Sequence, residues 1–230
     1  MRRSRAAEIM DDPGQSAADF DAALADLARI NRMSFATAPL LGFLDRVVRR
    51  SGPAPGRVLS VLDVGAGGGD ALRAIAAWGA RRGVALDLWG LDRSPWAGRH
   101  AAAHGTPAQW ITADLFDLPA GRRFDVVVCG LFAHHLDDAT LVRFLRWLPA
   151  HARHRWLILD LHRHWLPWAA VWAGTRLLRM HPMVCHDGPI SVARGFDRAD
   201  WRRLVAEAGV AAEARWVPPF RWAVEGPGAG

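Results

Sequence analysis

The residues best suited to hold a ligand lie in one glycine-rich segment, 61–70, with the sequence VLDVGAGGGD. Gly65, Gly67 and Gly69 follow an apolar run and precede a helical pattern. Glycine lets a backbone turn tightly and lets a ligand approach without interference from a Cβ atom. The segment can be a turn that merely tolerates glycine, but its place between a strand and a helix favours a ligand-binding loop.

Carboxylates follow the next two expected strands. Asp92 ends the second strand, where a carboxylate can accept hydrogen bonds from two ribose hydroxyls. Asp114 ends the third strand, where it can accept a hydrogen bond from an adenine amino group. These strand ends meet at the edge of the sheet where α/β folds bind ligands, which predicts a nucleoside-containing cofactor. A dinucleotide is disfavoured because the last glycine of Gly-x-Gly-x-x-Gly, counted from Gly65, falls on Asp70.

Histidines are the candidate proton acceptors, because the chain has no lysine and no tyrosine. A neutral imidazole can remove the proton of a phenol, whose pKa is about 10. His134 and His135 follow the fourth expected strand, and His162 and His164 follow the fifth. We expect both pairs to open onto the substrate side of the sheet. Alternatively, they cap a helix or shape the pocket, and Asp160 either orients one of them or only ends its strand.

No metal is predicted from ligand spacing. Segment 180–188 contains His181, Cys185 and His186 and is expected to be a loop, but its spacing does not match a closed zinc site. The chain has only two cysteines, Cys129 and Cys185, so it has no disulfide framework, which suits the reducing cytoplasm.

Short apolar runs alternate with helical patterns from residue 57 onward. Strands are expected at 58–64, 84–91, 109–113, 124–129 and 156–161, and helices near 72–83, 95–105, 140–148 and 198–208. All-apolar strands that alternate with helices predict a parallel sheet covered on both faces. Two last strands, near 212–217 and 220–224, are separated only by two prolines, so they must pair antiparallel. We therefore predict an α/β fold with a seven-stranded, mostly parallel sheet, an antiparallel last strand and helices on both faces.

Three parts are expected along the chain. They are an N-terminal helical segment that covers the site (1–56), a core domain (57–225) with a substrate-lid insertion (162–196), and a loose tail (226–230). The first part should contain helices near 16–30 and 38–50, after a loose start at 1–15, and should end in the breaker cluster 51–56.

The net charge of the 230-residue chain is +6, which invites a nucleic-acid partner. All 29 positive charges are arginine, however, and they come as scattered pairs. Arg49–Arg50 and Arg81–Arg82 stand at expected helix ends, where positive charge complements the helix dipole. Nucleic acid is therefore disfavoured. The chain has neither a run of 18 apolar residues nor the apolar core of a signal peptide, so a cytoplasmic protein is expected.

Four segments together resemble the class I S-adenosylmethionine-dependent methyltransferases. They are VLDVGAGGGD (61–70), GLDRS (90–94), TADL (112–115) and FDVVVCGLFAHHL (124–136). The last is similar to a motif of small-molecule methyltransferases of the ubiquinone/menaquinone-biosynthesis type. The resemblance covers about 57–225 and implies a Rossmann-like fold, with S-adenosylmethionine as the cofactor.

The resemblance also implies roles for individual residues. Cofactor-binding residues would be Asp63, Gly65, Ala66, Gly67, Asp92, Arg93, Asp114, Leu115 and Cys129. The glycine loop would hold the methionine part, Asp92 would hold the ribose, and Asp114 and Leu115 would frame the adenine. The backbone near Cys129–Gly130 would receive the amino-acid end. The candidate catalytic residues, chosen for their chemistry and for their places after the strands, are His135, His162 and His134. Metal-assisted quinone O-methyltransferases carry glutamates before the histidine, where Gly130 and His134 stand here, so magnesium is not expected.

The acceptor is expected to be a small hydrophobic molecule, methylated on a phenolic or quinol-like oxygen. Carbon methylation of a similar ring is the nearest alternative, followed by an RNA methyltransferase and a non-catalytic cofactor-binding protein. Amino-methylating nucleic-acid enzymes carry an Asn/Asp-Pro-Pro-aromatic loop where Cys129–Phe132 stand here. The tryptophan-rich segment 163–180 has arginines at its ends. It can be a core helix, a lid over the acceptor, or a peripheral contact with the inner membrane face.

Overall fold

The computed structural model describes residues 1–12, 14–51 and 58–229. The strands are β1 (Leu59–Val64), β2 (Leu86–Asp92), β3 (Gln109–Thr112), β4 (Phe124–Gly130), β5 (Ala152–Leu161), β6 (Glu213–Val217) and β7 (Arg221–Pro227). The helices are α1 (Ala17–Met33), α2 (Ala38–Ser51), α3 (Asp70–Arg82), α4 (Pro95–Ala103), α5 (Asp138–His151), α6 (Trp165–Leu177), α7 (Pro182–Arg194) and α8 (Arg198–Ala208). Short 3₁₀ turns are η1 (Ile9–Asp11), η2 (Leu115–Asp117) and η3 (Ala133–His135).

The seven strands form one sheet in the order β3-β2-β1-β4-β5-β7-β6. The five strands β1 to β5 pair in parallel, and β7 pairs antiparallel with both β5 and β6. This arrangement confirms the predicted fold class. The chain order reverses between β1 and β4, and open α/β sheets bind ligands beside the carboxyl ends of strands at such a point.

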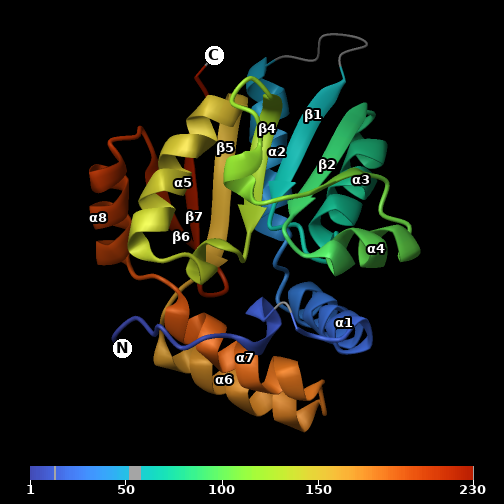
Figure 1. The fold of residues 1–230 in the computed structure, drawn as a ribbon. Helices are drawn as coiled ribbons and strands as arrows, with labels where there is room; N and C mark the ends of the chain where they lie inside the picture. Colours follow the sequence, from blue (N-terminus) through green and yellow to red (C-terminus); the bar gives the residue numbers. More distant parts are fainter. Residues whose placement is uncertain (13, 52–57, 230) are drawn as a thin grey trace.

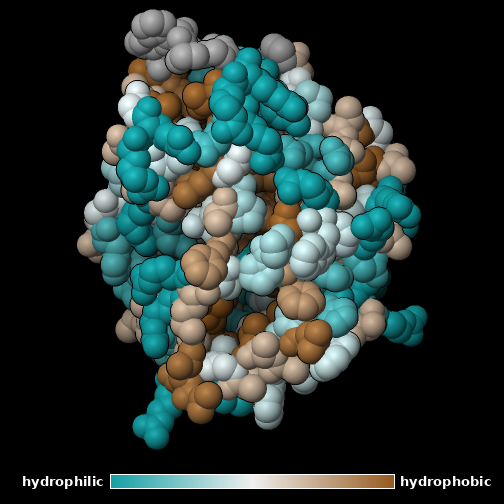
Figure 2. Space-filling view, turned by 180° about the vertical axis from the view of Figure 1, so that it is seen from behind, coloured by the Kyte–Doolittle hydropathy of each residue, from teal (hydrophilic) through white to brown (hydrophobic). Residues whose placement is uncertain are grey.

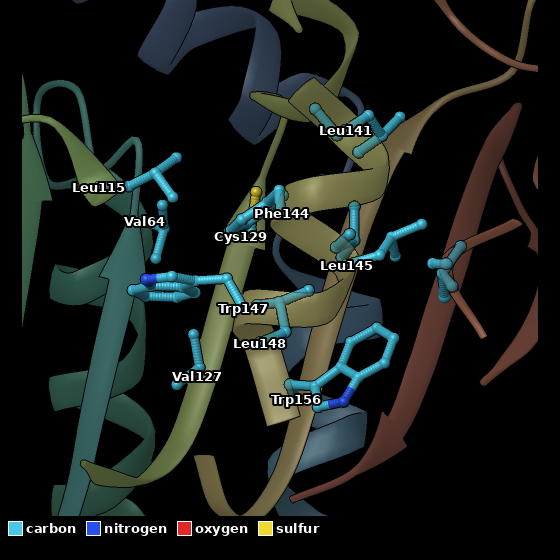
Figure 3. Close-up of a cluster of buried hydrophobic side chains, with 14 of the residues drawn as sticks. Val64, Leu115, Val127, Cys129, Leu141, Phe144, Leu145, Trp147, Leu148 and Trp156 are labelled. Carbon is cyan, nitrogen blue, oxygen red and sulfur yellow. The ribbon is translucent and has the colours of Figure 1, made fainter. Parts of the chain in front are cut away.

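Helices cover both faces of the sheet (Figure 1), and the mostly apolar central strands are accordingly buried along nearly their whole length. On one face, Trp156 and Val127 pack with residues of α5 such as Phe144 and Leu148 (Figure 3). On the other face, a second cluster joins β1 and β4 to α2 and α3. Helices α1, α6 and α7 lie together beyond the carboxyl ends of the strands (Figure 1), so they roof the edge at which a ligand would bind.

Helix α7 corrects the expectation of a loop at 180–188. Pro182 occupies the first turn of the helix, and the side chain of His181 accepts a hydrogen bond from the backbone N–H of Met183. The helix continues through Gly188 and Pro189, two residues that locally disfavour helix. Packing against α6 and η1 supports it. The prediction was wrong because tertiary contacts overrode these two breakers.

The N-terminal segment is also bound, so the expectation of a loose start at 1–15 was wrong for the residues described. The guanidinium of Arg3 donates to the carboxylate of Asp138. The backbone N–H groups of Ile9 and Met10 donate to the two carboxylate oxygens of Asp187, at 2.8 and 2.9 Å. These contacts fix η1 between α7 and the sheet edge.

The C-terminal residues extend the sheet, so the loose tail predicted at 226–230 was wrong for 226–229. Strand β7 runs to Pro227, and the N–H of Gly228 donates to the carbonyl of His154 at 2.8 Å. The breaker cluster 51–56 lies outside the described residues, apart from Ser51 at the end of α2.

Asp187→Ala removes the acceptor of two backbone N–H groups of the N-terminal segment. We expect the free energy of unfolding to fall by about 1.5–3 kcal/mol and proteolysis within residues 1–12 to accelerate. Asp12→Ala is the control, because Asp12 makes only an exposed turn hydrogen bond to Gly14 and should change stability by about 0.5 kcal/mol or less. Urea unfolding and limited proteolysis measure both effects, and equal protease resistance of the two variants would contradict this anchoring role.

Candidate active site

A cavity of about 970 Å³ lies at the carboxyl ends of the parallel strands. Its wall includes the glycine loop, η1, η3 and residues of α1, α6 and α7. The volume is at the upper end of the roughly 300–1,000 Å³ found for small-molecule sites. Most of the wall is apolar, and its polar groups include those of the glycine loop with the ends of β1 and β2, and those of the histidine turn η3.

The glycine loop adopts a backbone that favours glycine, with φ of +69° at Gly65, +49° at Gly67 and +73° at Gly69. A Cβ atom on Gly65 would lie 2.6 Å from the ring of Phe132, so this glycine is required by packing. A Cβ atom on Gly67 would meet only Leu24, at 3.8 Å, and Gly67 lines the cavity. The open space at Gly67 therefore fits the close approach of a ligand.

Buried carboxylates surround the loop. Asp92 accepts hydrogen bonds from the backbone N–H groups of Gly67 and Ser94, both at 2.8 Å, and burial raises its pKa. Burial also raises the pKa of Asp63 well above its usual range, and repulsion by Asp70 and Asp92 adds to this. Each carboxylate oxygen of Asp92 keeps a lone pair for another donor. A ligand with hydroxyl or ammonium groups would offset the cost of these buried acids.

Four other expected cofactor residues, Ala66, Arg93, Asp114 and Leu115, also line the cavity. Asp114 has a structural role as well, because its carboxylate accepts a hydrogen bond from the N–H of Phe116, at 2.9 Å, and begins η2.

Cys129 itself does not line the cavity, although the next residue of the backbone segment expected to bind the cofactor does. Its thiol is buried in the core near Phe144 (Figure 3), and burial raises its pKa well above the usual range. Alternate residues of a strand face opposite sides. The next residue, Gly130, lines the cavity instead.

The histidine turn presents two oriented imidazoles to the cavity. The Nδ1 atom of His134 lies 2.7 Å from Asp160, and that of His135 lies 3.0 Å from Asp11. Burial would raise the pKa of Asp160, but the charge and hydrogen bonds of His134 lower it overall. The carboxylate of Glu8 stands opposite both rings, 3.8 Å from each Nε2 atom, and burial raises its pKa.

Sequence reasoning missed Glu8 and Asp11, because no local spacing relates them to histidines more than 120 residues away. It also missed Asn31, whose amide donates to Asp70 at 3.0 Å and joins α1 to the start of α3. Asn31 is the only asparagine of the chain, which is the one signal that could have drawn attention to it.

His162 and His164 do not line the cavity, so the expectation that both histidine pairs open onto it was wrong. Its Nδ1 atom accepts a hydrogen bond from the indole of Trp216 at 3.0 Å, and its ring packs against Phe220 and Trp222. Burial and the nearby His164 lower the pKa of His162. The returning strand β7 and the loop before it cover this side of β5.

The strand order and the helices around the sheet are those of the Rossmann-like fold of solved S-adenosylmethionine-dependent methyltransferases. Residues 61–154 match the family model described as a methyltransferase domain. This match, together with the fold, supports the methyltransferase activity and the S-adenosylmethionine cofactor that the resemblance implied.

Solved structures of similar fold include three methyltransferases. Magnesium protoporphyrin IX methyltransferase from Synechocystis PCC 6803, with bound SAH, has a TM-score of 0.53 and 18% identity over 86% of this chain and 84% of that one. A plantazolicin methyltransferase complex with a triazolic analogue and SAH has a TM-score of 0.65 and 14% identity over 89% of both chains. A putative O-methyltransferase from Nostoc punctiforme PCC 73102 has a TM-score of 0.56 and 18% identity over 89% of this chain and 60% of that one.

No curated protein matches the sequence. At these identities the solved structures support the fold alone. The branch related to ubiquinone and menaquinone biosynthesis therefore stays a prediction.

Gly67→Ala and Gly65→Ala separate ligand binding from folding. Both place a side chain at positive φ, which costs about 1–2 kcal/mol. Gly65→Ala adds a clash with Phe132 and should destabilise the fold more. Gly67→Ala should remain better folded and lose S-adenosylmethionine affinity by about tenfold or more, measured by calorimetry alongside urea unfolding. Wild-type affinity in Gly67→Ala would remove this glycine from the cofactor site.

Proposed function

We propose that the protein transfers a methyl group to an oxygen atom of a small hydrophobic acceptor, of the phenolic or quinol type. The observation that carries the proposal is one cavity in which a largely apolar wall joins the glycine loop to the imidazoles of His134 and His135. An apolar wall selects an apolar ring or tail, and the imidazoles can take the proton of its hydroxyl.

S-adenosylmethionine would be held by the residues that sequence reasoning assigned, including the backbone near Cys129–Gly130. The amino-acid part would bind to the glycine loop, which contains Asp63, Gly65, Ala66 and Gly67. Asp92 and Arg93 would bind on the ribose side, and Asp114 and Leu115 would lie beside the adenine. When bound, this cofactor supplies an electrophilic methyl group on a sulfonium. The chain must therefore align the acceptor, exclude water and accept a proton.

His135 is the proposed proton acceptor. Because Asp11 is a carboxylate, the Nδ1 atom of His135 donates its proton to it, which leaves the Nε2 lone pair free to receive the proton of the acceptor. The Nδ1 atom of His134 donates to Asp160 in the same way, but the side chain of His134 is almost fully buried. Its main role is therefore to stabilise the turn η3, whereas His135 contacts the acceptor.

The acceptor would lie between the N-terminal segment and the insertion 162–196, which acts as a lid. From α6, Leu166 and Val171 line the cavity, and from α7, Met183 and Val184. Phe20 of α1 lies on the opposite wall. Closure by two separate segments would keep water from the reacting atoms.

The outer side of α6 is proposed to contact an anionic membrane surface. Trp165 is 61% exposed and Leu177 is 83% exposed, and the guanidinium of Arg176 stacks on the exposed Trp172. Figure 2 shows hydrophobic residues gathered at the end of the molecule where Figure 1 places α6 and α7. Tryptophan and arginine together suit the lipid headgroup region, and no helix among the described residues is long and apolar enough to span a bilayer.

His135→Gln keeps the size of the side chain and removes its basic nitrogen. We expect turnover with a phenolic acceptor to fall by about 10²–10⁴-fold while S-adenosylmethionine affinity is retained. A more acidic phenol should partly restore the rate, because it needs less help to ionise. The assay measures S-adenosylhomocysteine formation over a panel of phenols and quinols. A loss below tenfold would reject the base and favour carbon methylation.

Replacing Trp165 and Trp172 together by serine should weaken binding to phosphatidylglycerol vesicles by about tenfold or more, because two apolar side chains no longer leave water. Val58→Ser is the control, since Val58 is exposed and directly precedes β1, at the amino end of that strand. Flotation with vesicles at low and high salt measures the effect. Equal flotation of the double variant and the control would reject α6 as the contact.

A further inference from the structure

Three side chains meet at the acceptor end of the cavity: Glu8 from the N-terminal segment, and His134 and His135 from η3. Each offers one ligand atom, and the three atoms lie within 4.8 Å of one another. We propose that they bind one divalent transition-metal ion of the zinc type.

The orientation of the two imidazoles supports this site. Asp160 accepts the proton of His134 Nδ1 at 2.7 Å, and Asp11 accepts that of His135 Nδ1 at 3.0 Å. Both Nε2 atoms therefore carry free lone pairs, and both face Glu8. Histidines that bind metals almost always donate their other ring N–H to a carboxylate or carbonyl in this way.

The carboxylate of Glu8 supplies the second observation. Its side chain is only 4% exposed, and its Oε1 atom has no hydrogen-bond partner within the described residues. Its oxygens stand 3.8 Å from the Nε2 atoms of His134 and His135, which is too far for a hydrogen bond. The Nε2 lone pairs of His134 and His135 thus face the buried carboxylate of Glu8. A cation between them would be attracted to all three groups, whereas an empty arrangement leaves Oε1 unsatisfied.

The guanidinium of Arg194 does not replace such a cation. It lies 3.6 Å from Glu8 Oε1, and its hydrogen bonds go to the carbonyls of His134, His135 and Ala6 and to the carboxylate of Asp11. The hydroxyl of Ser191 donates to the other oxygen, Oε2, at 2.9 Å. These contacts hold the carboxylate in place, with Oε1 3.8 Å from His134 Nε2 and Oε2 3.8 Å from His135 Nε2.

The distances suit a small transition-metal ion. Zinc bonds of about 2.0–2.2 Å place two ligand atoms about 3.4 Å apart at a tetrahedral angle and about 4.2 Å apart at most. The separations of 3.8 Å from Glu8 Oε1 to His134 Nε2 and from Glu8 Oε2 to His135 Nε2 fall within this range. A pair of ligand atoms 4.8 Å apart, the limit for this group, would need a shift of about half an ångström. Two imidazoles favour zinc-like ions over magnesium. Two histidines and a glutamate also leave a fourth position open, as in catalytic zinc sites.

The inference rests on this geometry and not on the proposed acceptor. A metal ion at the site would occupy the Nε2 lone pair of His135. The metal-loaded protein would then lower the pKa of a coordinated acceptor hydroxyl, where the metal-free protein uses the imidazole as a base.

Zinc binding to the full chain, first stripped with a chelator, tests the site. Calorimetry should show one ion per chain, and Glu8→Gln and His135→Ala should each weaken binding by at least about tenfold. Asp11→Asn keeps all three ligands and should weaken binding by roughly 10–100-fold through the orientation of His135. His186→Ala, a half-exposed histidine on α7, is the control and should bind as the wild type does.

Cobalt(II) provides an independent measurement, because a tetrahedral site with this ion absorbs visible light. The absorption should appear in the wild type and in His186→Ala and be lost in Glu8→Gln, with circular dichroism confirming that each variant is folded. Absence of zinc binding, or equal binding by Glu8→Gln, His135→Ala and the wild type, would overturn the proposal. Methyl transfer by the stripped protein is assayed separately, so failure of the metal site is distinguished from failure of the proposed function.

Discussion

The acceptor end of the cavity depends on the guanidinium of Arg194, the last residue of α7. It donates to the backbone carbonyls of His134 at 3.0 Å and His135 at 2.8 Å, and to that of Ala6 at 3.1 Å. Carbonyls of a buried turn need such donors, because water does not reach them. One side chain therefore joins the histidine turn, the N-terminal segment and the α6–α7 pair, so the lid and the reactive groups form a single unit.

The cofactor end is built differently, from groups close together along the chain. The carboxylate of Asp92 accepts hydrogen bonds from the backbone N–H groups of Gly67, in the glycine loop, and of Ser94. The positive φ angles of the loop glycines leave space where a ligand can approach. Asp63, Asp70 and Asp92 are close enough for repulsion to raise the pKa of Asp63. Asn31 reaches this group from α1, so the helix above the site is attached to the loop it covers.

Helix α6 lies between the cavity and the proposed membrane surface, the two environments between which an apolar acceptor would pass. Pro167, Ala170 and Val171 line the cavity, whereas Trp165 and Leu177 face outward. A helix that is apolar all round is usually buried. Here one side is covered by the molecule itself, and the other side offers the apolar surface on which the proposed membrane contact depends.

The sequence by itself determined the sheet, the glycine loop and the place of Asp92, because apolar runs, glycines and caps are local signals that survive in the folded chain. Only the tertiary structure decided the acceptor site. Glu8 meets His134 and His135 across more than 120 residues, and α7 forms despite Gly188 and Pro189. Local periodicity specifies which side of an element is apolar, whereas the packing of those sides decides which distant polar groups share a cavity.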